Sequence, residues 1–296
     1  MTAVKIPILY LITVLIWGST WIAIEYQILE APIEVSLIYR FGMASVIMLG
    51  YCYFAGLSLR FSARDHLYIA LLALFNFSLN YYVTYESQKY LSSAMASIAF
   101  STMLMVNILN TRLFFKRSIT RNVYLGGSLG MIGIIVLFIP SLISDTLGSN
   151  LLLGLSLALV GTYIASLGNM ASVRNSRKGL SVLAVNAIGM SYGCLIMLAI
   201  FFFKGSSFVF PEAQSYWISI VYTAVLGTVI AFACYFVLLR EMGPERASYV
   251  IILFPVVAII ISVFVEDFKL TLYNLGGFML IALGNFLVTR QSPSKS

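Results

Sequence analysis

Neutral amides and hydroxyls interrupt several long apolar segments of the chain at helical spacing. Asn76, Asn80 and Thr84 recur at every fourth residue, so they share one face of a helix. Comparable stripes in later segments are Phe100, Met103, Asn107 and Asn110; Thr162, Ser166 and Asn169, with Tyr163 beside them; and Asn186 with Tyr192. A hydrogen bond between helices explains each amide taken alone. Four stripes at a similar depth favour a polar central cavity that holds a small solute by hydrogen bonds.

Aromatic side chains are interleaved with these polar stripes. The segment VLIWGSTWIAIEY (14–26) places Trp17 and Trp21 about one helical turn apart. Tryptophan usually lies at a membrane edge, whereas Trp17 falls at the middle of its segment. The expected aromatic lining of the cavity is Trp17, Trp21, Tyr82, Phe100 and Tyr163. An aromatic solute stacked there gains about 0.5–1.5 kcal/mol per ring pair. In this interpretation Gly18 lets another helix approach; the alternative is a core tryptophan wedged between helices.

Arg40 is the one charged residue deep inside an apolar segment. An ionisable side chain at that depth needs a partner and is a functional candidate. Two hypotheses stay open: Arg40 attracts a substrate carboxylate, or it forms a structural ion pair with Glu25, Glu30 or Glu34. No Asp or Glu occupies the middle of a segment, which favours a facilitator over a proton-coupled pump. Proton coupling through Glu25, or through protonation of the substrate itself, is the alternative.

The composition places these residues in a membrane. The chain has 296 residues, of which 60% are hydrophobic and only 10% are charged, against about 25% charged in a typical soluble domain. Its mean hydropathy is +0.97. The apolar blocks are continuous rather than alternating, and each approaches the ~20 residues that a membrane-spanning helix needs. The expected helices are 5–25, 33–55, 66–86, 91–114, 121–140, 150–172, 180–203, 214–238, 247–265 and 270–289.

Several other classes of protein are disfavoured. The first apolar block has no small-residue cleavage pattern, so we interpret it as a retained helix rather than a signal peptide. The three cysteines lie within apolar blocks and match no metal-site spacing. We find no nucleophile–base pair and no phosphate-binding loop, and we expect no enzyme activity, no cofactor and no metal. The net charge of +7 is spread over short loops, which indicates membrane topology rather than nucleic-acid binding.

The loop charges predict the orientation of the helices. Fourteen of the eighteen basic residues fall at one set of loops and termini, and three fall at the opposite set. The opposite set also carries eight of the eleven acidic residues. Because basic residues concentrate on the cytoplasmic side, both termini are expected to be cytoplasmic.

The two halves of the chain resemble each other. LGGSLGMIGIIVLF (125–138) recurs as LGGFMLIALGNFLV (275–288). Five helices per repeat is an odd number, so residues 1–140 and 150–296 are expected to be inverted repeats within one transmembrane domain around the central cavity. Such repeats are typical of transporters with a substrate site near the membrane midplane. We also expect the paired glycines 126–127 and 276–277 to pack their helices closely.

The chain resembles the drug/metabolite transporter superfamily, of the ten-helix type with two EamA repeats. The motifs that carry the resemblance are WGSTW (17–21), Arg40, Ala94–Ala96, ERAS (245–248), Pro255, Glu266 and the paired glycines. The aromatic lining is most similar to that of bacterial aromatic amino acid exporters. The halves have diverged: Lys116 stands where the second half has Glu266, so roles are not transferred between them by symmetry.

The resemblance implies a multi-pass protein of the bacterial inner membrane that exports aromatic or bulky neutral amino acids by alternating access, with lipid and a small-molecule substrate as partners. A broad metabolite or drug exporter is the alternative. A scaffold protein or a membrane-embedded enzyme is less consistent with the polar stripes. Pro255 is either a gating hinge or a packing kink. The sequence leaves the oligomeric state open.

Overall fold

The computed structural model describes residues 5–116, 121–143, 148–242 and 249–289, and this part of the chain is helical, without a strand. The elements are α1 (Lys5–Ile28), α2 (Ile33–Phe54), α3 (Ala63–Leu74), the π-helix η1 (Phe75–Leu79), α4 (Asn80–Gln88), α5 (Ser93–Phe100), α6 (Met103–Phe115), α7 (Arg121–Ile143), α8 (Gly148–Arg177), α9 (Val182–Lys204), α10 (Gln214–Val221), the π-helix η2 (Tyr222–Ile230), α11 (Ala231–Met242), α13 (Tyr249–Val265) and α14 (Leu272–Thr289).

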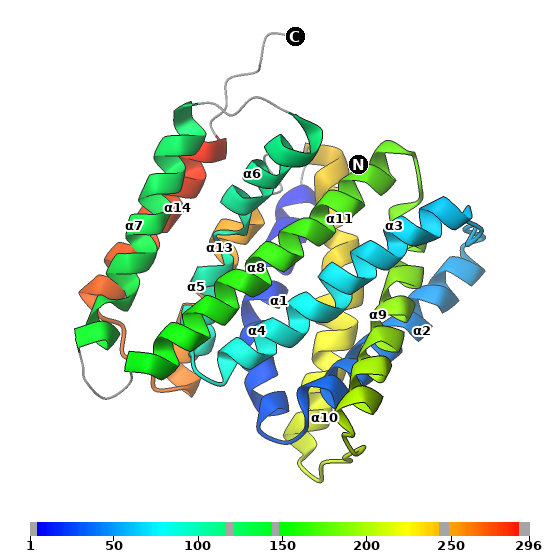
Figure 1. The fold of residues 1–296 in the computed structure, drawn as a ribbon, viewed down its shortest axis with the longest axis horizontal. Helices are drawn as coiled ribbons and strands as arrows, with labels where there is room; N and C mark the ends of the chain where they lie inside the picture. Colours follow the sequence, from blue (N-terminus) through cyan, green and yellow to red (C-terminus); the bar gives the residue numbers. More distant parts are fainter. Residues whose placement is uncertain (1–4, 117–120, 144–147, 243–248, 290–296) are drawn as a thin grey trace.

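These elements form ten apolar helical segments within the described residues. Seven are long and apolar enough to cross a membrane, and three shorter apolar stretches lie in α7, α13 and α14. Each segment overlaps one of the ten helices expected from the sequence. The segments are packed side by side as a bundle (Figure 1).

Three of the ten segments are not uniform α-helices, which the hydropathy pattern does not reveal. The third and eighth segments contain η1 and η2, so the same position in each half carries a π-helical stretch. The fourth segment breaks at Ser101 and Thr102, between α5 and α6. Asn285 of α14 donates a hydrogen bond to the Ser101 carbonyl at 3.0 Å, which satisfies a backbone group at this break. Pro255, by contrast, lies inside the continuous helix α13.

Most helix pairs join the first half of the chain to the second. The most extensive contacts join α7 with α14, the third segment with α8, and α2 with α9. The first segment packs on the eighth and ninth, and the sixth packs on the third and fourth. Each of these contacts therefore has a counterpart when the five segments of one half are exchanged for those of the other.

The α7–α14 pair depends on glycine. A Cβ on Gly133 would lie 2.7 Å from the carbonyl oxygen of Gly277, and a Cβ on Gly284 would lie 2.4 Å from that of Gly126. Any larger side chain would force the two backbones apart. The prediction that the glycine-rich helices pack closely is confirmed, and the pair lies at one side of the bundle (Figure 1).

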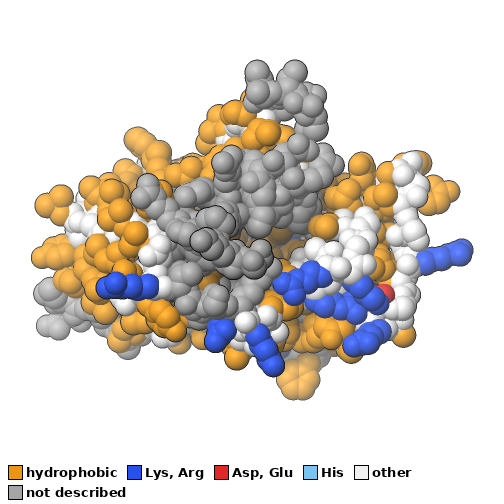
Figure 2. Space-filling model, turned by 90° about the horizontal axis from the view of Figure 1, so that it is seen from above, with side chains coloured by type: hydrophobic (Ala, Val, Ile, Leu, Met, Phe, Trp, Pro, Cys, Tyr) orange, Lys and Arg blue, Asp and Glu red, His pale blue; other side chains and the backbone are white. Residues whose placement is uncertain are grey.

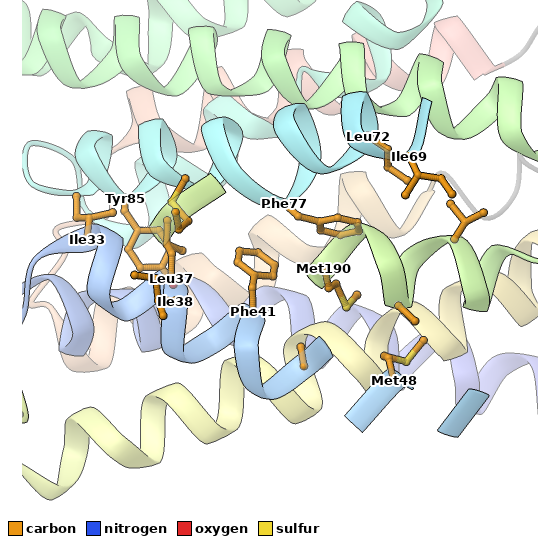
Figure 3. Packing of buried hydrophobic residues seen from close by; sticks show 14 of the residues in the cluster. Ile33, Leu37, Ile38, Phe41, Met48, Ile69, Leu72, Phe77, Tyr85 and Met190 are labelled. Carbon is orange, nitrogen blue, oxygen red and sulfur yellow. The ribbon is translucent and has the colours of Figure 1, made fainter. Parts of the chain in front are cut away.

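The main core cluster lies between α2, the third segment and α9. Phe41 of α2 and Phe77 of η1 are fully buried, with ring centroids 5.8 Å apart, and Met190 of α9 packs into the same cluster (Figure 3). A Cβ on Gly193 would lie 2.8 Å from the Cβ of Phe77. Close packing of this kind holds helices together in lipid, where the hydrophobic effect gives little help.

One end of the bundle is rich in basic side chains. In Figure 1, α1 begins and α14 ends toward the same end of the molecule. Seen from that end, the surface shows several Lys and Arg side chains and few acidic ones (Figure 2). Exposed basic residues near the ends of α2 and α8 are Arg60, Arg64, Arg177 and Lys178.

Candidate functional site

Three helical segments bring a cluster of amides together. Asn76 of η1 donates to the Oδ1 of Asn169 on α8 at 3.0 Å. Asn169 in turn donates to the Oδ1 of Asn107 on α6 at 3.2 Å and contacts the sulfur of Met103 at 3.5 Å. The close approach of α8 to η1 requires Gly168, because a Cβ added there would lie 2.8 Å from the Asn76 side chain. We call Asn76, Met103, Asn107 and Asn169 the amide cluster; it joins three of the predicted site residues.

Two further polar pairs lie along the same helix interfaces. Asn110 donates to the hydroxyl of Ser166 at 2.9 Å, which links α6 to α8. Asn80 accepts a hydrogen bond of 3.3 Å from Thr84 on its own helix. Gly161 of α8 sits against Thr84, with its Cβ position 3.0 Å from the hydroxyl. Ser166 and Asn80 are therefore buried and already hydrogen-bonded within the protein.

Aromatic rings from three helices form a second cluster. The ring of Trp21 on α1 lies edge-to-face with Phe100 of α5 at 5.5 Å and stacks with Phe254 of α13 at 6.0 Å. Phe100 and Phe254 are 6.5 Å apart. We call Trp21, Phe100 and Phe254 the aromatic cluster. Phe254 was missed in the sequence, although it directly precedes the singled-out Pro255.

Trp17 and Gly18 sit where α1 meets the second half. The indole N–H of Trp17 donates to the carbonyl of Gly227 in η2 at 3.2 Å, and its ring contacts Phe232 and Tyr235. A Cβ on Gly18 would lie 2.4 Å from the Cβ of Val257 on α13. The expectation that Gly18 lets another helix approach is confirmed. Because the protein itself satisfies the indole N–H, only the ring of Trp17 is free to contact a solute.

Arg40 is buried, with 2% of its surface exposed, and its neighbours are neutral. Its guanidinium lies over the Tyr81 ring at 4.5 Å and donates to the Tyr85 hydroxyl at 3.1 Å. Longer contacts of 3.4–3.5 Å reach Thr228 and the Tyr81 hydroxyl. Tyr85 donates to Gln27 at 2.7 Å. The sequence analysis missed these polar partners; the spacing of Tyr81 and Tyr85, four residues apart on one helix face, is the signal that could have found them.

The structural ion pair expected as one alternative for Arg40 is not present among the described residues. Glu34 instead accepts from Lys204 at 3.0 Å and from the hydroxyl of Ser206. Glu25 lines a separate pocket at the C-terminal end of α1, and Glu30 is exposed just beyond that end. Within the part of the chain that the structure describes, Arg40 thus lies inside the bundle without a carboxylate within ion-pair distance.

Three predicted site residues lie apart from these clusters. The hydroxyl of Tyr82 accepts a hydrogen bond from Lys204 at 3.0 Å, and the hydroxyl of Tyr192 pairs with the Nδ1 of His66 at 2.9 Å. Tyr163 is 47% exposed, while its neighbours Thr162 and Ala165 are buried on the packed face of α8. The structure therefore does not bring Tyr82, Tyr163 or Tyr192 to the amide or aromatic cluster.

A bundle of apolar helices with polar and aromatic clusters from both halves is the architecture of a multi-pass membrane transporter. The model of the EamA-like transporter family matches residues 4–139 and 152–290, and the chain belongs to this family. The two matches correspond to the two halves of the bundle.

Three relatives match most or all of the chain, and two of them are named as transporters. Protein PagO of Salmonella typhimurium is 22% identical over 302 residues, covering 100% of this chain and 97% of that protein. The uncharacterized inner membrane transporter YedA of Escherichia coli K12 is 27% identical over 254 residues, covering 84% and 78%. The uncharacterized transporter YoaV of Bacillus subtilis is 25% identical over 300 residues, covering 97% of each.

A solved crystal structure of a protein shares the fold. Its TM-score against this chain is 0.71 at 16% sequence identity, and the match covers 99% of this chain and 100% of that one.

Proposed function

We propose that this EamA-family transporter exports aromatic or bulky neutral amino acids across a bacterial inner membrane, by alternating access and without ion coupling. The observation that carries the proposal is the buried guanidinium of Arg40, which has aromatic and hydroxyl neighbours but no carboxylate partner among the described residues. A zwitterionic solute would supply the carboxylate that Arg40 lacks, and its aromatic side chain would find aromatic neighbours in the protein.

Arg40 is suited to recognise a carboxylate. A guanidinium carries five N–H donors in a planar fork that matches the two oxygens of a carboxylate. The short contact to Tyr85 and the longer ones to Tyr81 and Thr228 occupy only part of this capacity. A substrate carboxylate would therefore add a charge-assisted hydrogen bond that replaces weak contacts.

The aromatic cluster is suited to hold the side chain of the substrate. Trp21, Phe100 and Phe254 come from α1, α5 and α13, which belong to both halves of the chain. Rings from both halves are separated and rejoined when the halves rock against each other. Stacking that is made and lost in this way gives selectivity for flat, apolar side chains without permanent tight binding.

The amide cluster offers neutral hydrogen-bonding groups to the proposed substrate. Asn76, Asn107 and Asn169 are partly exposed and bond to one another rather than to a charged group. Neutral donors and acceptors can exchange partners with a passing zwitterion at small cost. They provide intermediate contacts between the two membrane faces in the proposed transport cycle.

The proposed cycle relates two inverted repeats with both termini in the cytoplasm. The matched helix pairs support this arrangement, as does the recurrence of a π-helix in the third and eighth segments. The basic end of the bundle in Figure 2 supports a cytoplasmic position for that end. Pro255 in α13 and the break at Ser101–Thr102 between α5 and α6 are the proposed hinges.

A second candidate is a broad metabolite or drug exporter coupled to protons. It is favoured by Glu25, a carboxylate near the outer end of α1 that has no hydrogen bond or ion pair in the described structure. A carboxylate without a cationic partner is suited to carry a proton.

Uptake into proteoliposomes tests the proposal. Radiolabelled tryptophan, phenylalanine and threonine and a cationic dye are compared, each with and without an imposed pH gradient. We expect uptake of the two aromatic amino acids above the other solutes, at a rate that the pH gradient does not change. Equal uptake of the dye, or uptake that follows the gradient, would establish the second candidate instead.

A further inference from the structure

A pocket of about 500 Å³ opens at the outer end of the bundle, apart from the clusters described above. Its lining comes from the end of α1, the connection between α4 and α5, and the end of α13. Glu25, Gln88 and Glu266 are among the lining residues. Neither the proposed carboxylate contact nor the aromatic cluster uses any of these three side chains.

Gln88 contributes a buried acceptor that has no partner. The residue is 3% exposed, and its Nε2 donates to the carbonyl of Trp21 at 3.0 Å and to the hydroxyl of Ser93 at 3.2 Å. Because the Trp21 carbonyl can only accept, these contacts fix the amide orientation and leave Oε1 as the unpaired atom. Buried carbonyl oxygens are rarely left unpaired, so a donor or a cation is the missing partner.

Two carboxylates line the same pocket and act on each other electrostatically. Glu266 accepts hydrogen bonds from the backbone N–H of Ser93 at 3.1 Å, from the Ser93 hydroxyl at 2.8 Å and from the Ser262 hydroxyl, and it forms no ion pair with any described residue. Glu25 has no hydrogen bond or ion pair in the described structure, and its electrostatic neighbour is Glu266. Lys89, the cation on the pocket wall, is paired with Glu86 at 2.8 Å. The pocket therefore carries uncompensated negative charge.

We propose that this outer pocket binds a primary ammonium group. Its oxygen acceptors come from Glu25, Glu266 and Gln88, and a primary ammonium offers three N–H donors and one positive charge. An ammonium seated there would separate the two repelling carboxylates and give Gln88 its missing partner. The inference goes beyond the proposed function, since an amine site at the outer end holds whether or not amino acids are transported. A small inorganic cation shares the charge but not the N–H donors.

Thermal unfolding of the purified full-length protein tests the site. The unfolding midpoint is followed during titration with methylammonium, sodium or tetramethylammonium chloride at constant ionic strength. We expect a saturable rise with methylammonium and none with tetramethylammonium, which has the charge but no N–H. A saturable rise with sodium alone would overturn the ammonium assignment, and no rise with any of the salts would overturn the site.

Variants of Glu25 test whether methylammonium binds in this pocket. Glu25→Gln should weaken methylammonium binding by about tenfold, whereas Glu212→Gln, the same change at an exposed outer position, should leave it unaltered. Glu25→Asp keeps the charge on a shorter side chain and should give an intermediate affinity. Because Glu25 has no bonded partner, the unfolding midpoints of these variants without added amine should stay close to that of the wild type. Methylammonium binding that survives in Glu25→Gln would contradict the proposal.

Discussion

The guanidinium carbon of Arg40 lies 4.5 Å from the centre of the Tyr81 ring, one of two cation–π contacts that the buried charge makes. The face of an aromatic ring is a weaker partner than a carboxylate, but it leaves the N–H groups of the guanidinium available. The ring of Tyr81 thus stabilises the charge of Arg40, while its hydroxyl accepts only one long contact of 3.5 Å from the guanidinium.

Replacing Tyr81 tests this stabilisation. Tyr81→Leu removes the ring and should lower the free energy of unfolding by about 0.5–2 kcal/mol. Tyr81→Phe is the matched control because it keeps the ring and loses only a long 3.5 Å contact to the hydroxyl. Denaturation in detergent micelles measures both variants. An equal effect of the two substitutions would mean that the hydroxyl, not the ring, holds Arg40.

Gly18 should tolerate no side chain. Gly18→Ala places a Cβ within 2.4 Å of Val257 and 2.8 Å of the Phe254 carbonyl, so we expect a loss of about 1–3 kcal/mol from overpacking between α1 and α13. Gly50→Ala on α2 is the control, since a Cβ there meets nothing within 4 Å. Unfolding midpoints of the two variants provide the comparison. A Gly18→Ala protein as stable as Gly50→Ala would exclude the close approach.

The aromatic cluster should set selectivity rather than overall activity. Trp21→Leu and Phe100→Leu each remove one ring proposed to stack on the substrate, so uptake of tryptophan should fall by about threefold to tenfold relative to leucine, as expected for one stacking pair. Tyr163→Ala is the control because its side chain is exposed, away from the buried Thr162 on the packed face of α8. Competition between the two amino acids in proteoliposomes gives the ratio. A fall in the tryptophan-to-leucine uptake ratio in Tyr163→Ala equal to that in Trp21→Leu would mean that Tyr163 also contacts the substrate.

The sequence predicted features that follow directly from side-chain chemistry. Apolar length predicted ten helical segments, the small size of Gly18 predicted a close helix contact, and helical spacing predicted that the faces bearing Asn76 and Asn107 point into the bundle, where Asn169 links the two amides. Each of these features is determined by the residue pattern of a single helix or by one close contact.

Other features depend on backbone register and on which partner each face meets, which hydropathy does not encode. The π-helices η1 and η2 and the break at Ser101–Thr102 lie within segments that hydropathy presents as single continuous spans. Tyr163 follows Thr162 by one residue, and one residue turns a helix by about 100°. That turn carries Tyr163 away from the packed face, although the two are adjacent in sequence.

Competition by tryptophan and tryptophanamide tests the central claim most directly, because the two solutes differ only in the charged carboxylate. In the wild type, tryptophan should bind more tightly than the amide. Arg40→Gln should weaken tryptophan by about tenfold and leave the amide unchanged, while Arg40→Lys should keep part of the preference. Arg40→Gln protein that folds and still prefers tryptophan, or that loses both solutes equally, would contradict the account.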